Sequence, residues 1–498
     1  MPVTHHAVVI AGAGPTGLML AAELKLAGID VAIVERRTGR ELVGTRARGL
    51  NARSIELLDQ RGMAGRFLAA GYTAQVHGFA HTRLDISDFP TRHPYGLALV
   101  QNHIERLLLE WCEDLGVAIL RGVELTAFTQ AETGIDISLA DGTMLRTGYL
   151  VGCDGGRSTV RKLAGIGFPG SNPTISNLLG EVEFTAQPPF GMRQSPRLHG
   201  INRTPEGQIQ VIVTEREVSL DREPSLADLS AELTDLYGSD FGVHSPTWLF
   251  RFNDASRQAE RYRAGRVLLA GDAAHIHYPA GGQGLNLGLQ DAVNLGWKLA
   301  QVVRGQSPDT LLDTYHAERH PVAARVLRNT MANVALARQD DRSQAAAAVV
   351  AELLATDAGR KLMAGQMSGL DIHYDLGPGH PLLGRRMPDL DLLVAGRPTS
   401  VFALLHDARP LLLNFGPAPA AARAWTGRVR VAEAETPGPW ELPVIGPVPA
   451  PTAVLIRPDG HVAWVGEAAT VGFEEALSTW FGAPEETKPA NRQTEDDP

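Results

Sequence analysis

Apolar runs separated by helical patterns dominate the first part of the chain. The run at 7–11 is followed by glycines and a helical pattern, and a second run at 31–34 ends in Glu35. Much later, a run at 267–270 meets a glycine and an aspartate, and another helical pattern follows over 286–303. In that helix the apolar or small residues recur at 289, 292, 293, 296, 299, 300 and 303, which predicts one buried face. Strands that alternate with helices favour an α/β fold.

The middle of the chain carries strand patterns of a different kind. Short strand-like stretches occur at 181–184, 208–217 and 247–252, with one helical pattern at 225–238. This spacing predicts a β-rich middle domain. Its residues Trp248, Phe250 and Phe252 alternate as strand residues do. We expect them to pack in a core, and the alternative is that they line an aromatic pocket.

The last quarter predicts a further domain. A helical pattern at 311–330, around Pro321, is followed by a stretch at 380–392 that we interpret as a linker. Strand patterns then occur at 410–415, 428–434 and 452–465, and a helical pattern occurs at 473–481. Pro458-Asp459-Gly460 predicts a hairpin turn inside the last strand pair. The polar tail at 484–498 is expected to be disordered.

Composition places the chain among average globular proteins. It has 498 residues, of which 44% are hydrophobic and 20% charged, enough for two to four domains. The net charge of −10 argues against a nucleic-acid partner. Cys112 and Cys153 have no metal or redox spacing, which favours a reducing cytoplasm. No stretch of 18 apolar residues is free of charge, so we expect neither a membrane span nor a signal peptide.

The first glycine loop has the pattern of a dinucleotide site. Gly12 permits a tight turn after a strand, Gly14 lets a pyrophosphate approach the backbone, and Gly17 lets the following helix pack closely. Pro15 suits the first turn of that helix, whose free N–H groups face the phosphates. Glu35, at the end of the next strand, is placed to accept hydrogen bonds from ribose hydroxyls.

The second glycine loop lies some 270 residues later and differs in chemistry. Asp272 follows a strand and can accept hydrogen bonds from a polyol chain, and Gly281, Gly282 and Gly284 precede a helix. The free N–H groups of that helix can stabilise negative charge on a ligand. His275 and His277 form an H-x-H pair without a third ligand nearby, so we expect no metal site.

A third motif, YLVGCDGGRSTVR at 149–161, completes an ordered set. GAGPTG, CDGGRSTVR and GDAAHIHYPAGGQGLN, in this order, resemble the class A flavoprotein aromatic hydroxylases, the p-hydroxybenzoate hydroxylase-like family. The resemblance covers residues 1 to about 385. It is strongest to bacterial aromatic polyketide oxygenases of the angucycline type, which also carry a C-terminal thioredoxin-like domain.

The resemblance implies a set of cofactor-binding residues. The ADP part of FAD would be held by the first loop and Glu35, with Arg36 among the arginines that follow. Arg46 and Gln101 match positions near the pyrophosphate and ribityl chain, Asp154 matches a position that handles both FAD and NADPH, and Asp272 matches the ribityl-binding acid. The complete set expected at the cofactor is Gly12, Gly14, Pro15, Thr16, Gly17, Glu35, Arg36, Arg46, Gln101, Asp154, Asp272, Pro279, Gly281, Gly282, Gln283, Gly284, Leu285 and Asn286.

The resemblance also implies a domain layout. A Rossmann-like FAD-binding domain would comprise 1–176 and 263–385, with the second part rich in long helices. A β-sheet substrate domain would comprise 177–262 together with 73–97. A thioredoxin-like domain would comprise 386–483. Because this last segment contains no cysteine, it cannot carry out dithiol redox chemistry, and its expected role is packing or contact with a second copy in a homodimer.

The implied reaction is hydroxylation of a polycyclic aromatic polyketide in antibiotic biosynthesis. In this family NADPH or NADH reduces FAD, O2 adds at flavin C4a, and the resulting hydroperoxide hydroxylates an electron-rich ring. The cofactor carries this chemistry, and no side-chain triad or general base stands out in the sequence. Two alternatives keep the fold and change the outcome. One is inactivation of an antibiotic such as a rifamycin or tetracycline, and the other is a Baeyer–Villiger reaction on a ring ketone.

Overall fold

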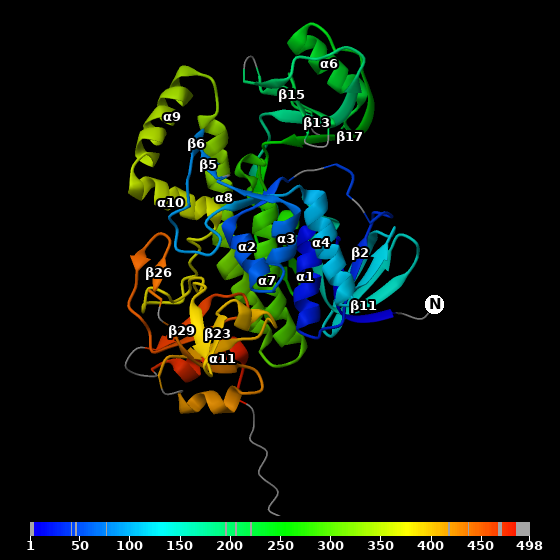
Figure 1. Cartoon of the computed structure of the whole chain (residues 1–498). Coiled ribbons are helices and arrows are strands. Elements are labelled where there is room, and N and C mark those ends of the chain that lie inside the picture. The colour runs from blue at the N-terminus through cyan, green and yellow to red at the C-terminus, as the bar shows by residue number, and fades with distance from the viewer. Residues whose placement is uncertain are drawn as a thin grey trace, which may run out of the picture.

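The computed structural model describes residues 4–40, 42–44, 47–75, 77–194, 197–204, 207–219, 222–416, 419–436, 438–466 and 471–484. Arg46, expected near the pyrophosphate, lies outside these residues, as does the tail beyond 484. Figure 1 shows three regions around a central body: a β-rich lobe at one end, a helical arm beside it, and a C-terminal lobe at the opposite end. No described helix is long and apolar enough to cross a membrane.

The central body is built on a largely parallel sheet, in which β9, β10 and β19 are the antiparallel strands. Its strands follow the order β19-β20-β11-β1-β2-β8, and β9 and β10 extend it from β11. β1 pairs in parallel with both β11 and β2, so Val9 and Ile10 are fully buried. The strand bounds are β1 Thr4–Ala11, β2 Val31–Glu35, β8 Ala118–Arg121, β9 Leu125–Ala131, β10 Gly134–Leu139, β11 Met144–Gly152, β19 Arg263–Ala264 and β20 Val267–Leu269. The alternation of apolar runs and helices therefore predicted the sheet correctly.

Helices α1, α4 and α7 pack around this sheet. Their bounds are α1 Pro15–Leu26, α4 Gln101–Asp114 and α7 Gln283–Val303. α1 and α7 approach closely because α7 has glycines at the contact: a Cβ on Gly296 would lie 2.6 Å from the Glu23 Cβ. The prediction that α7 buries one face is wrong. Its polar residues Asp291, Asn294 and Lys298 are also buried, since α8 and the C-terminal lobe cover the face that the pattern left polar.

Residues 73–97 do not join the middle domain, contrary to the expectation. β4 and β7 form a three-stranded sheet with β3, and β5 and β6 form a separate hairpin. Phe79, Leu84 and Ile86 pack against α10, in a cluster that also contains Met367. The elements here are β3 Gly49–Leu50, α2 Ala52–Asp59, α3 Ala64–Ala70, β4 Tyr72–Ala74, β5 Gly78–Phe79, β6 Thr82–Arg83 and β7 Gly96–Ala98. The late helices α9 and α10, which the sequence patterns had not indicated, supply the apolar surface that recruits this segment.

The β-rich lobe is an antiparallel sheet in the order β14-β15-β16-β13-β17, with helix α6 on one face (Figure 1). Its elements are β13 Ser176–Phe184, β14 Gly191–Arg193, β15 His199–Arg203, β16 Ile209–Thr214, α6 Leu226–Tyr237 and β17 Val243–Asn253. The strand and helix patterns of 181–252 are confirmed. α6 begins with a capping box at Ser225 and Asp228 and ends at Gly238 in the left-handed conformation.

The remaining helices precede the C-terminal lobe in the chain. They are α5 Thr159–Leu163, α8 Asp313–Leu336, α9 Asp341–Leu354 and α10 Asp357–Ser368, and the short strands β12 Gly170–Ser171, β18 Ser256–Gln258 and β21 His275–Ile276 form one small sheet. The 3₁₀ segments are η1 Gly271–Ala273, η2 Ala280–Gly282, η3 Asp309–Leu312, η4 Ala403–Leu405 and η5 Ala420–Trp425. α8 contains Pro321, as the pattern predicted.

The C-terminal lobe contains a six-stranded sheet in the order β23-β22-β25-β24-β28-β29. Its elements are β22 Asp391–Val394, β23 Arg397–Ser400, β24 Leu411–Asn414, β25 Arg430–Glu435, β26 Glu441–Leu442, β27 Gly446–Pro447, β28 Ala453–Ile456, β29 Val462–Gly466 and α11 Phe473–Phe481. The predicted strands, hairpin and final helix are confirmed. The segment 380–392 is not a linker, because Leu382 and Met387 are fully buried in the core of this lobe.

Candidate cofactor and substrate site

The first glycine loop has the geometry that its sequence predicted. Gly12 has φ +105°, and a Cβ there would lie 2.4 Å from the Cys153 carbonyl oxygen. A Cβ on Gly17 would lie 2.0 Å from the Gly12 carbonyl oxygen, so the helix is packed against the turn. Gly14, by contrast, would meet no protein atom within 4 Å. The loop is therefore closed on its protein side and open at Gly14, above the α1 N-terminus that begins at Pro15.

Glu35 closes the far side of this loop. Its carboxylate accepts hydrogen bonds from the Ala13 N–H at 2.7 Å and the Arg37 N–H at 2.8 Å. Burial alone would raise the pKa of Glu35, but the two amide hydrogen bonds and the Arg37 charge lower it. The group is therefore a carboxylate at neutral pH, as a hydrogen-bond acceptor for ribose hydroxyls must be.

Arg37, and not Arg36, is the arginine that builds the first loop. Arg36 is exposed, whereas the Arg37 guanidinium donates to the Ala13 carbonyl at 3.0 Å and to Glu105 at 2.9 Å. Glu105 in turn accepts from Gln101 at 2.8 Å, which connects Gln101 to the same network. The alternation of buried and exposed positions after a strand could have separated Arg37 from Arg36. Its partner Glu105 lies in α4, so no pattern in the sequence around Arg37 indicated the contact.

Asp154 caps a helix. Its carboxylate accepts from the Ser158 hydroxyl at 2.5 Å and from the Thr159 and Val160 N–H groups, so it fixes the start of α5. Arg161 of that helix donates to the Ala273 carbonyl at 2.9 Å. The middle motif therefore connects the two glycine loops, because the Cys153 carbonyl packs on Gly12 and Arg161 contacts the residue after Asp272.

Asp272 is the acid best placed for a ligand. It lies in η1, it is exposed, and its carboxylate makes no hydrogen bond with any other described residue. Gly271 before it has φ +63° and donates its N–H to Asp291 at 3.2 Å. A Cβ on Gly284 would lie 4.0 Å from the Asp272 carboxylate, so this acid faces the start of α7.

A buried ion-pair cluster that sequence reasoning missed holds this turn. The Asp291 carboxylate accepts from Arg319 at 2.7 Å and contacts the His275 Nε2 at 2.7 Å, and all three side chains are fully buried. Burial alone would raise the pKa of Asp291, but Arg319 and His275 lower it. Asp291 is one of several polar residues on the face of α7 that periodicity predicted to be exposed, so no local pattern distinguished it.

The N-terminus of α7 is uncapped by any side chain. Gly281 and Gly282 have φ +76° and +63°, a conformation that favours glycine, and α7 begins immediately after them. Gln283 donates to the carbonyls of Gly281 and Met367, and Asn286 donates to the Gly282 carbonyl at 2.8 Å. These two side chains therefore shape the loop from behind. Pro279 is exposed and Leu285 is half-buried at its two ends.

His277 is a neutral acceptor beside this loop. Its Nδ1 lies 2.8 Å from the Tyr278 carbonyl oxygen, and since a carbonyl only accepts, Nδ1 carries the proton. Burial lowers the pKa of His277, which keeps the ring neutral. Nε2 is then a bare acceptor, and it lies 3.4 Å from where a Cβ on Gly284 would be. Among the described residues, no group of three or more His, Cys, Asp or Glu side chains, with or without His277, could hold a metal ion.

The two glycine loops adjoin each other through Thr16. Its hydroxyl would lie 2.6 Å from a Cβ on Gly271 and 2.3 Å from one on Gly288 of α7. The open Gly14, the acceptor at Asp272 and the free α7 N-terminus therefore belong to one site. An elongated ligand with an anionic end, a polyol middle and a ring that accepts negative charge fits these three features in this order, and FAD has that composition.

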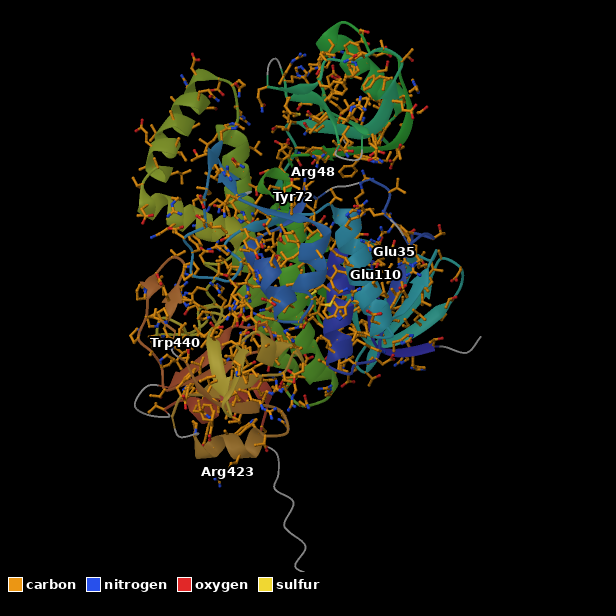
Figure 2. All side chains as sticks on the ribbon, in the orientation of Figure 1. Glu35, Arg48, Tyr72, Glu110, Arg423 and Trp440 are labelled. Carbon is orange, nitrogen blue, oxygen red and sulfur yellow. The ribbon has the colours of Figure 1, made fainter. Side chains whose placement is uncertain are left out.

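The β-rich lobe presents an aromatic face to this site. Phe252 contacts the Tyr278 ring at 5.7 Å, and Phe250 stacks on Phe252 at 6.1 Å. The expectation that these aromatics pack in a core is wrong, because α6 covers the opposite face of the sheet and leaves them half-buried. Arg48 connects the central body to the β-rich lobe, because it donates to Gln210 of the antiparallel sheet at 2.7 Å. Figure 2 labels Arg48 where these two regions meet.

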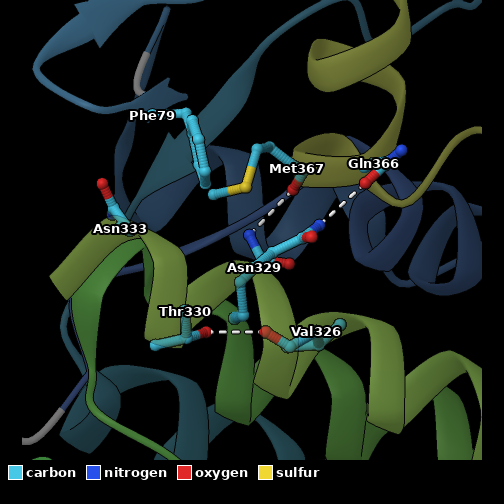
Figure 3. A pocket seen from close by; sticks show the side chains of 8 residues that line it. Phe79, Val326, Asn329, Thr330, Asn333, Gln366 and Met367 are labelled. Atoms are coloured by element: carbon cyan, nitrogen blue, oxygen red, sulfur yellow. Dashed lines mark hydrogen bonds between the residues drawn. The ribbon is translucent and has the colours of Figure 1, made fainter. Parts of the chain in front are cut away.

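A small pocket adjoins the second glycine loop between α8 and α10. Phe79, Gln283, Val326, Asn329, Thr330, Asn333, Gln366 and Met367 line it. Figure 3 shows Asn329 donating to Gln366 at 2.7 Å, while Met367 and Phe79 form the apolar wall. The pocket is thus continuous with the α7 N-terminus through Gln283.

Comparisons with known proteins match nearly the whole chain. The FAD binding domain family model matches residues 5–330, and the model for the aromatic-ring hydroxylase C-terminal domain matches residues 380–484. A rifampicin monooxygenase of Streptomyces venezuelae is 46% identical over 494 residues, which cover 96% of this chain and 98% of that protein.

Solved structures show the same similarity in three dimensions. The anhydrotetracycline hydroxylase OxyS from Streptomyces rimosus has a TM-score of 0.90 and 43% identity, over 97% of this chain and 100% of that one. CabE, an aromatic hydroxylase from angucycline biosynthesis, has a TM-score of 0.89 and 40% identity, over 96% of this chain and 100% of that one.

Proposed function

This chain belongs to the family of FAD-binding aromatic-ring hydroxylases and is a flavoprotein monooxygenase, and from that premise we propose that it hydroxylates a polycyclic aromatic polyketide in an antibiotic pathway. The observation that carries the substrate class is the aromatic face of Phe250 and Phe252, which meets the second glycine loop at Tyr278. A flat, fused-ring substrate matches such a face by stacking. The relatives OxyS and CabE, named for a tetracycline-type and an angucycline-type pathway, support the same class.

The overall reaction balances with NADPH or NADH and O2. The nicotinamide supplies two electrons, one oxygen atom enters an aromatic C–H bond as a hydroxyl group, and the other leaves as water. When bound, FAD supplies the electron transfer and the activation of O2. The chain's own contribution is binding, orientation and exclusion of water.

The residues assigned to FAD divide by the part that they would contact. We assign Gly12, Gly14, Pro15, Thr16, Gly17 and Glu35 to the ADP part, and Asp272 to the ribityl hydroxyls. Gly281, Gly282 and Gly284 at the α7 N-terminus are assigned to the ring, where free N–H groups would stabilise negative charge. Support comes from the openness at Gly14, the exposed Asp272 without a hydrogen-bond partner among the described residues, and the uncapped helix start.

The supporting residues hold the residues assigned to FAD in place. Arg37 donates to Glu35 directly, and Glu105, which also accepts from Gln101, holds Arg37 in place. Asp154 fixes α5, and Gln283 and Asn286 shape the loop before α7. Pro279 and Leu285 complete that loop, and Arg36 remains assigned only as an exposed charge near the adenosine end. We propose that NADPH binds transiently on the exposed side of the FAD-binding body that carries Arg36, since no separate nicotinamide domain is present among the described residues.

We propose that the C-terminal lobe is a thioredoxin-like domain, and its strand order supports this assignment. β25 and β24 are parallel, β28 and β29 follow antiparallel in the order β25-β24-β28-β29, and α11 closes the lobe. The absence of cysteine from 386–483 rules out dithiol chemistry there.

A panel experiment tests the proposed function. Purified protein loaded with FAD is given NADPH, O2 and one polycyclic aromatic polyketide at a time. A substrate should accelerate NADPH oxidation and gain one oxygen atom. If no member of a broad polycyclic panel stimulates NADPH oxidation, the substrate class is wrong.

A second function with the same fold is inactivation of an antibiotic. The 46% identity to a rifampicin monooxygenase favours this candidate. A rifamycin included in the panel separates the two, because inactivation predicts consumption of the antibiotic and loss of its growth inhibition. Product structures then distinguish ring hydroxylation from insertion of oxygen beside a ring ketone.

A further inference from the structure

The hairpin turn Pro458-Asp459-Gly460 of the C-terminal lobe is buried inside the FAD-binding body. A polar turn of this kind normally lies in water, yet Arg457 and Asp459 are 0% and 2% exposed. Arg53 donates to the Asp459 carbonyl at 2.9 Å, and Arg61 donates to the Pro458 carbonyl at 2.8 Å. The turn therefore inserts beside α2, whose residues and C-terminal extension supply both arginines.

The first step inward from this turn is an ion-pair cluster. Arg457 binds Glu318 of α8 through two hydrogen bonds of 2.6 and 2.8 Å, and it also contacts Asp459. Lys298 of α7 donates to the same Glu318 at 2.8 Å. Burial alone would raise the pKa of Glu318, but Arg457 and Lys298 lower it to about 2, so Glu318 is a carboxylate at neutral pH. The hairpin thereby fixes α7 and α8 relative to each other.

The second step passes through Asn294 and Tyr374. Asn294 of α7 donates to Asp459 at 3.2 Å and to Glu318 at 2.7 Å, and it lies 3.4 Å from the Tyr374 hydroxyl. Arg319 donates to the same hydroxyl at 3.3 Å. The Tyr374 hydroxyl thus joins the hairpin cluster to Arg319.

The third step reaches the second glycine loop. Arg319 binds Asp291, and Asp291 accepts the Gly271 N–H immediately before Asp272. A continuous series of buried polar contacts therefore runs from the C-terminal hairpin to Gly271, the residue immediately before Asp272. Arg61 gives a second connection, since it also pairs with Glu23 of α1 at 2.6 Å, in the helix that begins at the first glycine loop.

Stability alone does not account for this cluster. Buried ion pairs add little net stability over a well-packed apolar core of the same volume, because each charge must be desolvated. What such a network of mutually bonded buried charges supplies is a fixed geometry. The geometry that this one fixes is that of the loop carrying Asp272.

We propose that Arg457 and Asp459 are positioning residues for the cofactor. Through them the C-terminal lobe sets the conformation of the second glycine loop. The proposal rests on the proposed binding of FAD at the two glycine loops. It gives the cysteine-free C-terminal lobe a role in the reaction: it holds Gly271 and Asp272 in the orientation that binds the ribityl chain, and it touches neither cofactor nor substrate.

The test compares three variants by their affinity for FAD. Asp459→Asn removes a charge next to Arg457, and Tyr374→Phe removes only the hydroxyl that joins Asn294 to Arg319. Val454→Ala is the matched control, since Val454 is fully buried in β28 of the same hairpin and makes none of the network contacts. Apoprotein is titrated with FAD, binding is followed by flavin fluorescence and absorbance, and the melting temperature is recorded for each variant.

Both network variants should weaken FAD binding by about 2- to 30-fold, the range of couplings carried by packed networks. Val454→Ala should lower the melting temperature and leave the FAD affinity and the flavin spectrum as in wild type. Asp459→Asn combined with Tyr374→Phe should cost less than the product of the two single effects, because both interrupt the same series of contacts.

The outcomes separate this proposal from the proposed function. If wild-type protein fails to bind FAD, the proposed function is wrong. If wild type binds FAD and both network variants bind it equally well, the positioning role is overturned while the proposed function stands. If Asp459→Asn does not fold, Tyr374→Phe decides alone, since it removes one oxygen atom from a ring that stays packed.

Discussion

Gly14 and Asp272 are the residues at which this protein is open to a ligand. A Cβ on Gly14 would meet no protein atom within 4 Å, and Asp272 is exposed with no hydrogen-bond partner among the described side chains and amides. Both were predicted from the sequence because each depends on a local pattern, a strand followed by a glycine turn. Arg37 was not in the predicted set of cofactor-binding residues, because its structural role depends on a hydrogen bond to Glu105, 68 positions away.

Gly14→Ala should leave the fold intact and reduce FAD binding. The backbone at Gly14 is extended, with φ −77°, so alanine is tolerated there. The added methyl group would occupy the space of the pyrophosphate and should weaken FAD binding about tenfold, or about 1.4 kcal/mol. Gly17→Ala serves as contrast, since its Cβ would lie 2.0 Å from the Gly12 carbonyl and should lower the melting temperature as well.

Asp272→Ala should weaken FAD binding without affecting the apoprotein. Loss of hydrogen bonds to a charged group costs about 1.5–3 kcal/mol, or roughly 10- to 150-fold in affinity. Asp272→Asn keeps an acceptor oxygen and should lose less. Equal FAD affinity in wild type and the alanine variant, measured by equilibrium titration, would show that Asp272 does not contact the ribityl chain.

His77 should make the protein less stable in acid. Burial lowers the pKa of His77 from 6.5 to about 4. The unfolded chain therefore binds the proton more readily between these values, so this contribution to the unfolding free energy is complete above pH 6.5 and declines as the pH falls toward 4. The loss amounts to about 3 kcal/mol. His77→Phe should flatten the dependence of the unfolding free energy on pH in urea titrations, and parallel curves for the two proteins would contradict this assignment.

At the scale of elements, periodicity predicted the strands and helices but not what covers them. The pattern of α7 predicted one buried face, yet Asp291, Asn294 and Lys298 on its polar side are buried against α8 and the C-terminal hairpin. Likewise, 73–97 packs on α10 because apolar residues such as Phe79 find a partner in Met367. Such partners lie beyond the reach of a local pattern: Lys298 and Glu318 are 20 positions apart, and Asn294 and Asp459 are 165 positions apart.

Strand β17 offers a paired test of the substrate face. Phe250 lies on the face directed toward the second loop, whereas its neighbour Leu249 packs against the α6 side. Phe250→Ala should raise KM for a polycyclic substrate about tenfold with little change in melting temperature. Leu249→Ala should lower the unfolding free energy by about 1–3 kcal/mol and leave KM unchanged. Equal effects of the two variants on KM would show that the face does not bind substrate.

At the scale of the molecule, three regions converge on one site. The first glycine loop, the second glycine loop and the aromatic face of the β-rich lobe come from 12–17, 271–286 and 248–252, and Thr16 and Tyr278 join them. The order of the three motifs was sufficient to predict the family. It could not show that the C-terminal hairpin enters the same body, since Pro458-Asp459-Gly460 has the sequence of an exposed turn.

The source of the oxygen atom in the product tests the central claim most directly. Protein reconstituted with FAD is incubated with NADPH, a polycyclic aromatic polyketide that stimulates NADPH oxidation, and isotopically labelled O2, and the product is analysed by mass spectrometry. The account predicts a product with one added oxygen atom, derived from O2, and the consumption of one NADPH for each product molecule formed. A product whose added oxygen derives from water, or turnover that needs neither FAD nor NADPH, would contradict it.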